Sequence, residues 1–538
     1  MRKLRVYALV ALLAPCPAGG QSNDPLTPLR DARLPGWVTA WGPLARQNAD
    51  HRVLPFVPAL PGLLDAPPPR VGHFWSAANP AALAYEASDS WGTIRLRKGS
   101  EHGTHRRPLD AADYGIQQFS GLRWQPLGAR SAVAGQVVAD ETTSRVSSHS
   151  PLLVRHSPSP FVVADGMTTP MRHIRVRVEG AYGWRAGPWG FGGALGLEVS
   201  DDRTSESRTP RLGRTSAPAV TLGLFRRLGS SLAGSVHGRW ISAHENTRIV
   251  VRRGTQVVVR ELDGFGEPKP LRVIGSNIFS RNVGRARGAV GATLSGRAGA
   301  WQWVAQGERE DIGHKHESSR LSVDPPDRWE AGSWRAGLDL MGHVGPLRAL
   351  VSGRYTTLGG DAFRRDLVGQ GAIFRVRQRA LLGLVDLRMP SPDSTWMAAV
   401  QVSFRREERL RHDFLIGAAS DLGFQHPGAS VEIARSLSGH TSVSVGGGTT
   451  GYEPAGTVPA AGVHGDVDPV LVAPELAIYS GRARAYTATA AIRVRLGDGP
   501  ALVARGRFHR LAPVGRQAEP GVRRSWWTMS VSAIWDGE

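Results

Sequence analysis

The sequence predicts an all-β fold, a transmembrane antiparallel up-and-down β-barrel of about 18 strands, with roughly 16 to 20 as the range. Three observations predict it. From Trp91 onward, apolar residues alternate with polar or small residues at the period of a β-strand. Short and long connections alternate along the chain, and aromatic residues form two groups at opposite strand ends. A soluble β-sandwich shares the first pattern but has no reason to show the other two.

Length and composition alone would give a different picture. The chain has 538 residues, a formal net charge of +20 and a pI near 11.1. These values suggest several soluble domains and a polyanionic partner, either nucleic acid or anionic lipid. Glycine is abundant, at 65 residues, but follows no collagen period, and a hydrophobic fraction of 41% is too high for disorder. Fibrous and disordered classes are therefore excluded.

The first twenty residues predict a secretory signal peptide, residues 1–20. A basic stub, Met1–Arg5, precedes an apolar run, Val6–Ala14, and then the small residues Ala18–Gly20. The single cysteine, Cys16, lies inside this segment, so a mature chain offers no disulfide, zinc-thiolate site or cysteine nucleophile. No later run of about 18 apolar residues predicts a membrane-spanning helix. An exported chain of this kind is either soluble outside the cytoplasm or a barrel.

Residues 21–90 form a Pro-rich N-terminal segment without sustained alternation. It is expected either to extend into the periplasm or to fold back into the barrel as a plug, and a barrel of this size has room for one. Near its end, Asn79-Pro80 has the residue types of a turn initiator. An ordinary turn is the simpler interpretation of that dipeptide.

The stretch Phe74–Leu83, which contains Trp75, Asn79 and Pro80, resembles a known segment. It is similar to the Asn-Pro-Ala segment found just before the first strand of FadL-like outer-membrane transporters. It also resembles the Trp-then-Asn-Pro-Ala arrangement of other outer-membrane barrels. The resemblance covers about ten residues besides the barrel pattern. It implies an outer-membrane barrel, and the FadL-like transporters carry hydrophobic molecules through typically smaller barrels.

The barrel itself is predicted for residues 91–538. In typical segments, one strand face carries large apolar side chains and the other small or polar ones; examples are Phe191, Leu195, Leu197 and Val199, then Trp396, Val400, Val402 and Phe404, then Tyr486, Ile492, Val494 and Leu496. Each segment is long enough to cross a bilayer as a tilted strand.

The connections fix the strand count. Short turns are predicted at Leu127–Ala129, Gly187–Pro188, Gly229–Ser231, Ala298–Ala300, Gly345–Pro346, Pro390–Asp393, Ser438–Gly439 and Gly497–Pro500. Long connections are predicted at Gly99–Asp113, Ser147–Arg172, Arg203–Ser216, Thr247–Ser276, Lys315–Asp327, Gly359–Phe374, Glu408–His412, Glu453–Pro474 and Val514–Arg523. Outer-membrane barrels have this asymmetry, with tight periplasmic turns and long external loops, and an even strand number, here about 18.

Aromatic residues support the same orientation. One group lies beside the short turns or the C-terminus: Trp184, Trp189, Trp301, Trp303, Trp396 and Trp535. The other lies near the long connections: Trp240, Trp334, Tyr355, Tyr486 and Trp527. Amphipathic rings gather at both interfaces of a membrane, so two belts are expected.

The motifs that could indicate an enzyme, a cofactor site or a metal site each have a simpler structural explanation. Gly446–Gly451 matches G-x-G-x-x-G, but Tyr452-Glu453-Pro454 follows where a dinucleotide site needs a helix. His314–Glu317 and Asp466–Asp468 are expected to be polar stretches of external loops rather than metal sites. No Gly-x-Ser-x-Gly elbow occurs. We therefore expect no catalytic residues, no cofactor and no metal.

Strand phase gives the strongest functional prediction. If the apolar face meets lipid, an Arg-rich face lines the interior; the opposite phase would place arginine in hydrocarbon at roughly 2 to 4 kcal/mol each near the midplane. The predicted interior arginines are Arg175, Arg177, Arg239, Arg335, Arg348, Arg354, Arg405, Arg493, Arg495 and Arg507. Such a surface can select anions, unless interior acids or the N-terminal segment neutralise it.

The sequence therefore predicts a channel or passive transporter of the bacterial cell outer membrane with an Arg-rich lumen and an unassigned substrate. The alternative is a non-conducting scaffold or accessory subunit of a larger surface complex. Expected partners are outer-membrane lipid, lipopolysaccharide and a small anionic or amphipathic solute, but not nucleic acid. Lipopolysaccharide phosphates would meet loop arginines: Arg203, Arg208, Arg211, Arg214, Arg252 and Arg253. The pattern leaves the oligomeric state open.

Overall fold

The computed structural model describes residues 79–86, 90–104, 113–145, 162–165, 170–204, 211–250, 256–262, 264–265, 269–274, 278–318, 327–364, 371–390, 395–457, 469, 481–497, 499–514 and 523–536. The predicted signal peptide at 1–20, Trp75, the loop residues Arg208, Arg252 and Arg253, and Asp466–Asp468 lie outside these residues.

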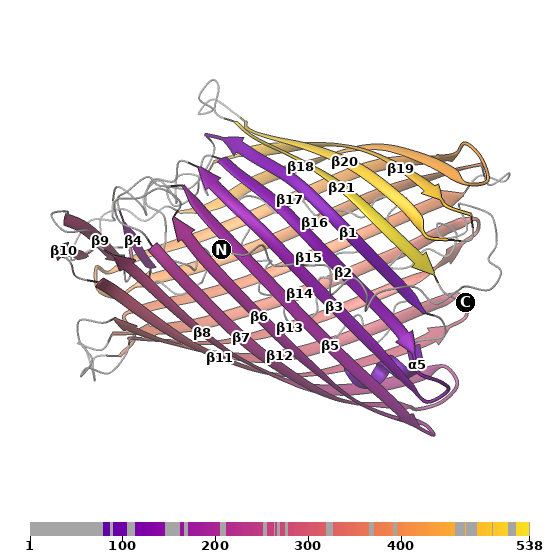
Figure 1. Ribbon diagram of the computed structural model, residues 1–538, viewed down its shortest axis with the longest axis horizontal. Helices are drawn as coiled ribbons and strands as arrows, with labels where there is room; N and C mark the ends of the chain where they lie inside the picture. Colours follow the sequence, from indigo (N-terminus) through magenta and orange to yellow (C-terminus); the bar gives the residue numbers. More distant parts are fainter. Residues whose placement is uncertain are drawn as a thin grey trace, which may run out of the picture.

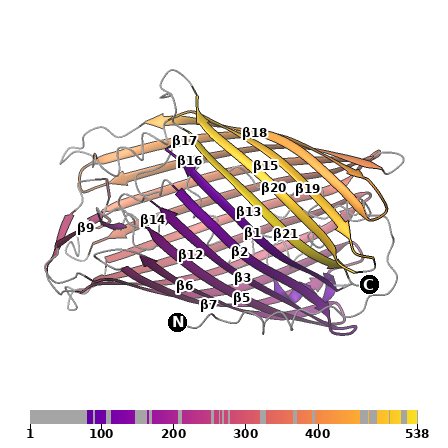
Figure 2. The same cartoon turned by 45° about the horizontal axis from the view of Figure 1, so that its top comes forward.

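The described strands form a closed antiparallel up-and-down β-barrel with an 18-stranded wall, which confirms the predicted fold class and strand number. The wall contains β1 (Trp91–Gly103), β2 (Asp113–Pro126), β3 (Ser131–Arg145), β5 (Met171–Ala186), β6 (Trp189–Thr204), β7 (Arg211–Arg227), β8 (Leu232–Val250), β11 (Ile278–Ala298), β12 (Trp301–Ser318), β13 (Asp327–Val344), β14 (Leu347–Phe363), β15 (Phe374–Pro390), β16 (Trp396–Asp413), β17 (Ala418–Ser436), β18 (Thr441–Thr457), β19 (Ala483–Arg495), β20 (Ala501–Pro513) and β21 (Arg524–Asp536). Figure 2 shows the same wall from a second side.

The barrel closes between its first and last strands. β1 pairs with β2 on one side and with β21 on the other, in a register that sets Trp91 against Asp536 and Gly103 against Arg524. Trp91 begins the wall and Asp536 ends it, so an even number of strands returns the chain to the end where it started. Closure leaves the wall without an unpaired edge.

Each predicted short turn lies between two paired strands. Gly187 and Gly345 adopt φ values of 56° and 59°, in the left-handed region that glycine enters without strain. One predicted long connection, Glu408–His412, is wrong because these residues belong to β16. The charged run continues as a strand that pairs with β17, and its side chains form ion pairs on both faces, as in Arg405–Glu407 and Arg406–Glu408.

Two further loop predictions need correction. His314–Glu317 is not in a loop but on β12. The predicted long connections Ser147–Arg172 and Thr247–Ser276 contain short strands that form a second, three-stranded sheet. This sheet consists of β4 (Val162–Asp165), β9 (Gln256–Leu262) and β10 (Lys269–Ile274). It lies at the end of the barrel opposite to the C-terminus (Figure 1). These short strands pair with each other and not with the wall, so strand periodicity along the wall did not reveal them.

The outer face of the wall is apolar. Exposed side chains include Leu195, Leu222, Val236, Val290, Leu338, Val385, Val402, Ile433, Val445 and Val531. Near the short turns, Trp184, Trp189 and Trp396 are exposed, and toward the other end Trp240, Trp334, Tyr355 and Tyr486 are exposed. No helix among the described residues is long and apolar enough to cross a membrane.

Tryptophan side chains cover several glycines of the outer wall. An added Cβ at Gly92 would lie 2.5 Å from Trp535 Nε1, and one at Gly296 would lie 2.6 Å from Trp303 Cζ2. The two residues of each pair face each other across neighbouring strands. An indole laid over a strand glycine restores the packing that the missing side chain would provide.

Candidate functional site

The interior face of the barrel holds the predicted arginines. Arg177, Arg239, Arg354 and Arg493 are buried, with 5%, 6%, 3% and 4% of their surface exposed. The adjacent residue in the sequence points outward in each case, with 43% to 52% of its surface exposed; these residues are Val178, Trp240, Tyr355 and Ile492. The half-buried members share this strand phase: Arg175, Arg335, Arg348, Arg405, Arg495 and Arg507. Their contact with a solute stays a prediction.

On β8, β12 and β13, arginines and glutamates form a compact interior cluster. Arg239 Nη2 lies 3.3 Å from both Glu308 Oε1 and Glu310 Oε1. Arg335 donates to the same two carboxylates, at 3.1 Å and 2.7 Å. His237 Nε2 lies 3.2 Å from Glu308 Oε2. Each carboxylate therefore meets two guanidinium groups, so this part of the wall neutralises its own arginines.

The next strands repeat this pairing. Arg354 Nη2 lies 2.6 Å from Asp339 Oδ2, and Ser352 donates to the same carboxylate at 2.6 Å. On β15, Arg388 pairs with Asp386 at 3.1 Å, and Gln401 of β16 donates to Asp386 at 2.8 Å. Further along β16, the Glu407 carboxylate lies 2.7 Å from Arg405 and 2.9 Å from Arg409.

On the other side of that cluster, β3, β5 and β6 carry a mixed set. Arg175 pairs with Asp140 across the strands at 2.5 Å. Arg177 is buried one residue pair further along, and its Nε and Nη1 atoms have no hydrogen-bond partner in the part of the chain that the structure describes. Its cross-strand neighbour is Glu198 on β6.

Between β17 and β1, arginine outnumbers acid on the described interior face. The interior arginine arc comprises Arg493, Arg495, Arg505, Arg507, Arg524, Arg95 and Arg97. Among the residues of the same strands whose burial the structure describes, the interior carboxylates are Glu432 and Glu101. Arg505 lies 3.5 Å from Glu432, and Arg524 contacts Glu101. Every arginine of the arc takes part in further contacts. Ion pairs with carboxylates therefore hold several arginines on β8 to β16, whereas the strands from β17 to β1 carry two described interior carboxylates beside seven arginines.

A polar recess lies beside the interior arginine arc. Its volume is about 60 Å³, and it extends over β16 to β20. The side chains of Ser403, Ser430, Thr450, Thr487, Thr489, Gln401, Glu432, Arg507 and His509 line it. Thr487 Oγ1 lies 2.7 Å from His509 Nδ1, and the His509 ring stacks on Trp526 with 4.7 Å between centroids. Hydroxyl, amide and guanidinium groups share this surface with the Glu432 carboxylate.

An apolar collar encircles part of the interior at the long-loop end. It includes Trp329, Phe374, Val376, Leu422 and Phe424, all buried. Phe265, from the connection between β8 and β11, packs into this collar with its ring 5.3 Å from that of Phe374. Its backbone N–H donates to Asp413 at 2.6 Å, and the Arg411 guanidinium lies 5.0 Å from its ring centroid. A long loop is thereby anchored to the strands across the mouth.

Sequence reasoning missed Phe265. It stands between glycines in a polar stretch, Glu261–Glu267, which reads as an ordinary surface loop. A lone aromatic ring inside such a stretch was the signal that could have found it, because a large apolar side chain is rarely left in water without a reason.

At the short-turn end, the Asn-Pro-Ala segment lies inside the barrel. Asn79 caps the helix η3 (Pro80–Ala82), which continues into α5 (Leu83–Glu86). Asn79 Nδ2 donates to Val236 O at 2.9 Å, and its Oδ1 accepts from Ala81 N at 3.0 Å. Figure 1 shows α5 next to β5.

Glycines of β5, β6 and β7 make room for this segment. An added Cβ at Gly183 would lie 2.6 Å from Pro80 O, one at Gly190 would lie 2.5 Å from Ala81 O, and one at Gly223 would overlap Asn79 Oδ1. The Tyr85 hydroxyl contacts the carbonyls of Gly187 and Trp189, and partial burial raises the pKa of Tyr85. Leu83 also packs with Trp124 of β2 and Ala132 of β3, so the segment is fitted against strands from β2 to β7. Its resemblance to FadL-like transporters stays a prediction.

No protein-family model and no curated protein matches this chain. Among solved structures, the ferric preacinetobactin receptor BauA of Acinetobacter baumannii is similar at 9% identity, over 84% of this chain and 80% of that one, with a TM-score of 0.35. P. aeruginosa FpvA bound to heterologous pyoverdines is similar at 10% identity, over 83% and 72%, with a TM-score of 0.41. The copper transporter OprC is similar at 9% identity, over 82% of this chain and 80% of that one, with a TM-score of 0.36. Likeness at this level carries no argument about function.

The described residues contain no group of three or more histidine, cysteine or acidic side chains placed to hold a metal. His314 and His316 both face the interior from β12, with ring centroids 6.1 Å apart. His237 and His509 face the interior from separate strands and take part in the separate contacts given above. Gly446–Gly451 runs through β18, so no helix begins there.

Proposed function

We propose that the protein is an outer-membrane channel or passive transporter for small, hydrophilic anions. The observation that carries this proposal is the interior arginine arc beside the polar recess. A solute moving along β17 to β1 would meet guanidinium groups and hydroxyls there. On β8 to β16, several interior arginines are held in ion pairs with carboxylates. Rings or rows of arginine favour anions in a narrow aqueous path.

Membrane insertion is supported by the outer face. Exposed aliphatic side chains surround the wall, and the two aromatic groups lie toward opposite ends of it. Such a band can meet lipid acyl chains, with tryptophan and tyrosine at the two interfaces. The short turns would then face the periplasm and the long connections the outside.

Two narrow places would control passage. At the outer mouth, the loop residue Phe265 is anchored to Asp413 inside the apolar collar. At the periplasmic end, the segment Asn79–Glu86 lies against β3 and against β5 to β7. A solute would pass both, so selectivity would come from the arc and rate from the two ends.

Charge reversal tests the proposal. Arg493, Arg495 and Arg507 are changed together to Glu, and reversal potentials are measured across planar bilayers in a salt gradient. We expect the preference for anions over cations to fall or invert, because three positive side chains on the solute path become negative. The control reverses Arg203, Arg226 and Arg435, which lie on the outer face. Reversal potentials unchanged from those of the wild type would refute the proposed path.

The second candidate is a non-conducting scaffold or accessory subunit of a larger surface complex. The specific observation in its favour is that segments pack into both ends of the barrel, at Phe265 and at Asn79. Electrically silent bilayers together with a protein that co-purifies in a fixed ratio would support this candidate over the channel.

A further inference from the structure

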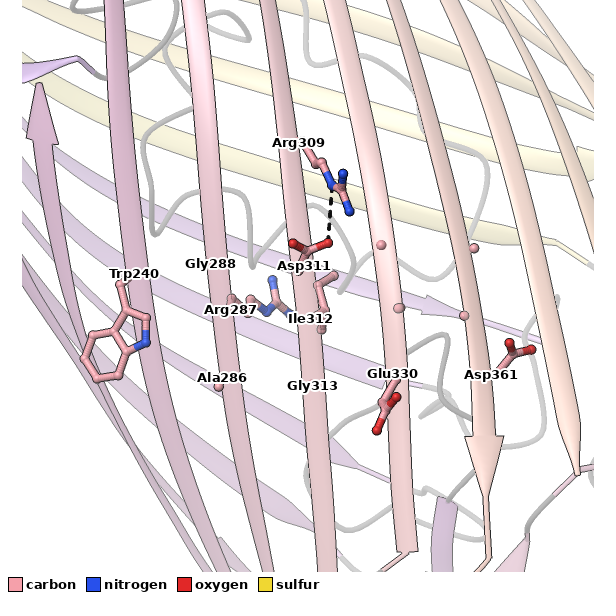
Figure 3. Close-up of a pocket in the computed structure, with 14 residues that line it drawn as sticks. Trp240, Ala286, Arg287, Gly288, Arg309, Asp311, Ile312, Gly313, Glu330 and Asp361 are labelled. Atoms are coloured by element: carbon pink, nitrogen blue, oxygen red, sulfur yellow. Dashed lines mark ion pairs between the residues drawn. The ribbon is translucent and has the colours of Figure 1, made fainter. Parts of the chain in front are cut away.

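The outer face carries a shallow depression near the long-loop end, shown in Figure 3. Its volume is about 620 Å³, and its floor crosses β11 to β14. Glycines pave the floor: Gly288, Gly313, Gly332 and Gly359. An added Cβ at Gly288, Gly313 or Gly359 would meet nothing within 4 Å, so the surface is open above them. Strands are spaced by about 4.8 Å, which makes this floor roughly 15 Å wide.

Charged and aromatic side chains surround the floor. Trp240 lies at one side, and Arg309, Asp311, Glu330 and Asp361 point outward around it. Arg309 lies 3.5 Å from Asp311, and its guanidinium carbon lies 5.7 Å from the centroid of the Trp334 ring. Trp240 and Trp334 belong to the exposed aromatic residues toward the long-loop end, so the depression begins where the apolar band ends.

Strand β15 shows this boundary most sharply. Its outward side chains are, in order, Arg375, Arg377, Arg379, Leu381, Gly383, Val385, Leu387 and Met389. The apolar members from Leu381 to Met389 are exposed, apart from the glycine. Three consecutive outward arginines therefore lie directly above an apolar stripe. The boundary repeats on β16, where Arg406 is followed by Phe404, Val402 and Val400.

The arginines next to the depression are available for a ligand. In register, Arg377 lies opposite Gly359 of the floor, and Arg375 lies opposite Asp361. Arg375 pairs with Asp361 at 2.7 Å. Arg377 and Arg379 are exposed, and none of the described residues forms an ion pair or hydrogen bond with the side chain of either.

We propose that this surface binds a phosphorylated glycolipid of the outer leaflet, of the lipid A type. Its phosphate groups would accept hydrogen bonds from Arg377 and Arg379, which can each donate as a fork. Its sugar rings would lie on the glycine floor, with hydroxyls donating to Glu330 and Asp361. Its acyl chains would cover the apolar stripe below Arg379. The inference shares with the proposed function only the outer-membrane location.

The glycine floor favours a glycolipid over a glycerophospholipid. A single phosphate with two acyl chains would need the arginines and the apolar stripe but would leave the floor and its acidic rim unused. A phosphorylated disaccharide uses both, because flat rings fit a surface without side chains and hydroxyl groups donate to carboxylates. Charge complementarity and shape therefore select the same occupant.

Native mass spectrometry on the full-length protein in dodecyl maltoside tests the inference. The probes are diphosphoryl lipid A, monophosphoryl lipid A and phosphatidylglycerol. We expect diphosphoryl lipid A to bind at least about tenfold more tightly than phosphatidylglycerol, because each lost charge-assisted hydrogen bond costs about that factor. Arg377→Glu with Arg379→Glu should weaken lipid A binding by about tenfold or more.

Two other variants separate the contribution of the arginine charges from that of the glycine floor. Arg226→Glu with Arg435→Glu makes the same charge change at the short-turn end of the outer face and should leave binding within about twofold of the wild type. Gly359→Leu fills the floor without changing charge and should weaken lipid A but not phosphatidylglycerol. Equal binding of lipid A to the wild type and to the Arg377/Arg379 variant would overturn the inference, as would equal binding of lipid A and phosphatidylglycerol. Heat-modifiable migration on a gel verifies that each variant is folded, and an unchanged reversal potential in the Arg377/Arg379 variant separates this result from the channel proposal.

Discussion

Single residues on the interior face differ in how much they stabilise the barrel, and burial decides the difference. The side chains of Arg354 and Asp339 are 3% and 1% exposed, whereas those of Arg172 and Glu141 are 52% and 32% exposed. Both pairs join neighbouring strands through short contacts. A buried charge that loses its partner cannot recover its hydration, but an exposed one can.

We therefore expect Asp339→Ala to lower the free energy of unfolding by about 3 kcal/mol or more. Glu141→Ala, the matched exposed change, should lower it by less than about 1 kcal/mol. Urea titrations of the protein in detergent micelles, followed by tryptophan fluorescence, measure both values. If the two variants lost the same stability, water would have to reach Arg354 as freely as Arg172.

Residue phase was predictable from the sequence, but residue partners were not. Placing Arg239 and Arg354 on the same face as small and polar residues requires only the period of two along one strand. The pairing of Arg239 with Glu308 depends on how β8, β11 and β12 are shifted against each other, and the sequence pattern does not set that register. Which carboxylate pairs with which arginine was therefore visible only in the structure.

At the scale of elements, strands and turns were predictable and loop contacts were not. The tight turns contain residue types with a known backbone preference, as in Gly187-Pro188. The packing of Phe265 against β13 to β17 joins segments far apart in the chain, and nothing local encodes it. The same holds for Asn79, whose hydrogen bonds reach Leu224 and Val236.

The loop that carries Phe265 should limit conductance. Phe265→Ala removes the ring from the apolar collar. The loop then keeps only its backbone hydrogen bond to Asp413, so we expect it to spend less time bound to the wall. Single-channel currents of the variant should be larger than those of the wild type and should fluctuate more. The control is Phe414→Ala, which removes an exposed ring from the turn after β16 at the same end. Identical currents in the wild type and in Phe265→Ala would mean that the loop is not part of the conduction path.

At the scale of the whole molecule, stability depends on one seam. The wall has no free edge because β1 pairs with β21 along its full length, from Trp91–Asp536 to Gly103–Arg524. This pairing joins the first and last strands of the wall, so it has the largest sequence separation of any strand pair in the wall. The sequence predicted the strand number that allows closure, while the contacts that secure it are specific to the structure.

The indole of Trp535 covers Gly92 at this seam, so Gly92→Val should weaken closure. The new Cβ would lie 2.5 Å from Trp535 Nε1, which forces the ring away at a cost of about 1 to 3 kcal/mol. The folded band on a semi-native gel should then disappear at a lower temperature than in the wild type. Gly238→Val serves as the control, because a Cβ there meets nothing within 4 Å and valine favours a strand. Equal transition temperatures for the two variants would show that the indole moves aside freely and that the backbone pairing of β1 with β21 secures the seam without it.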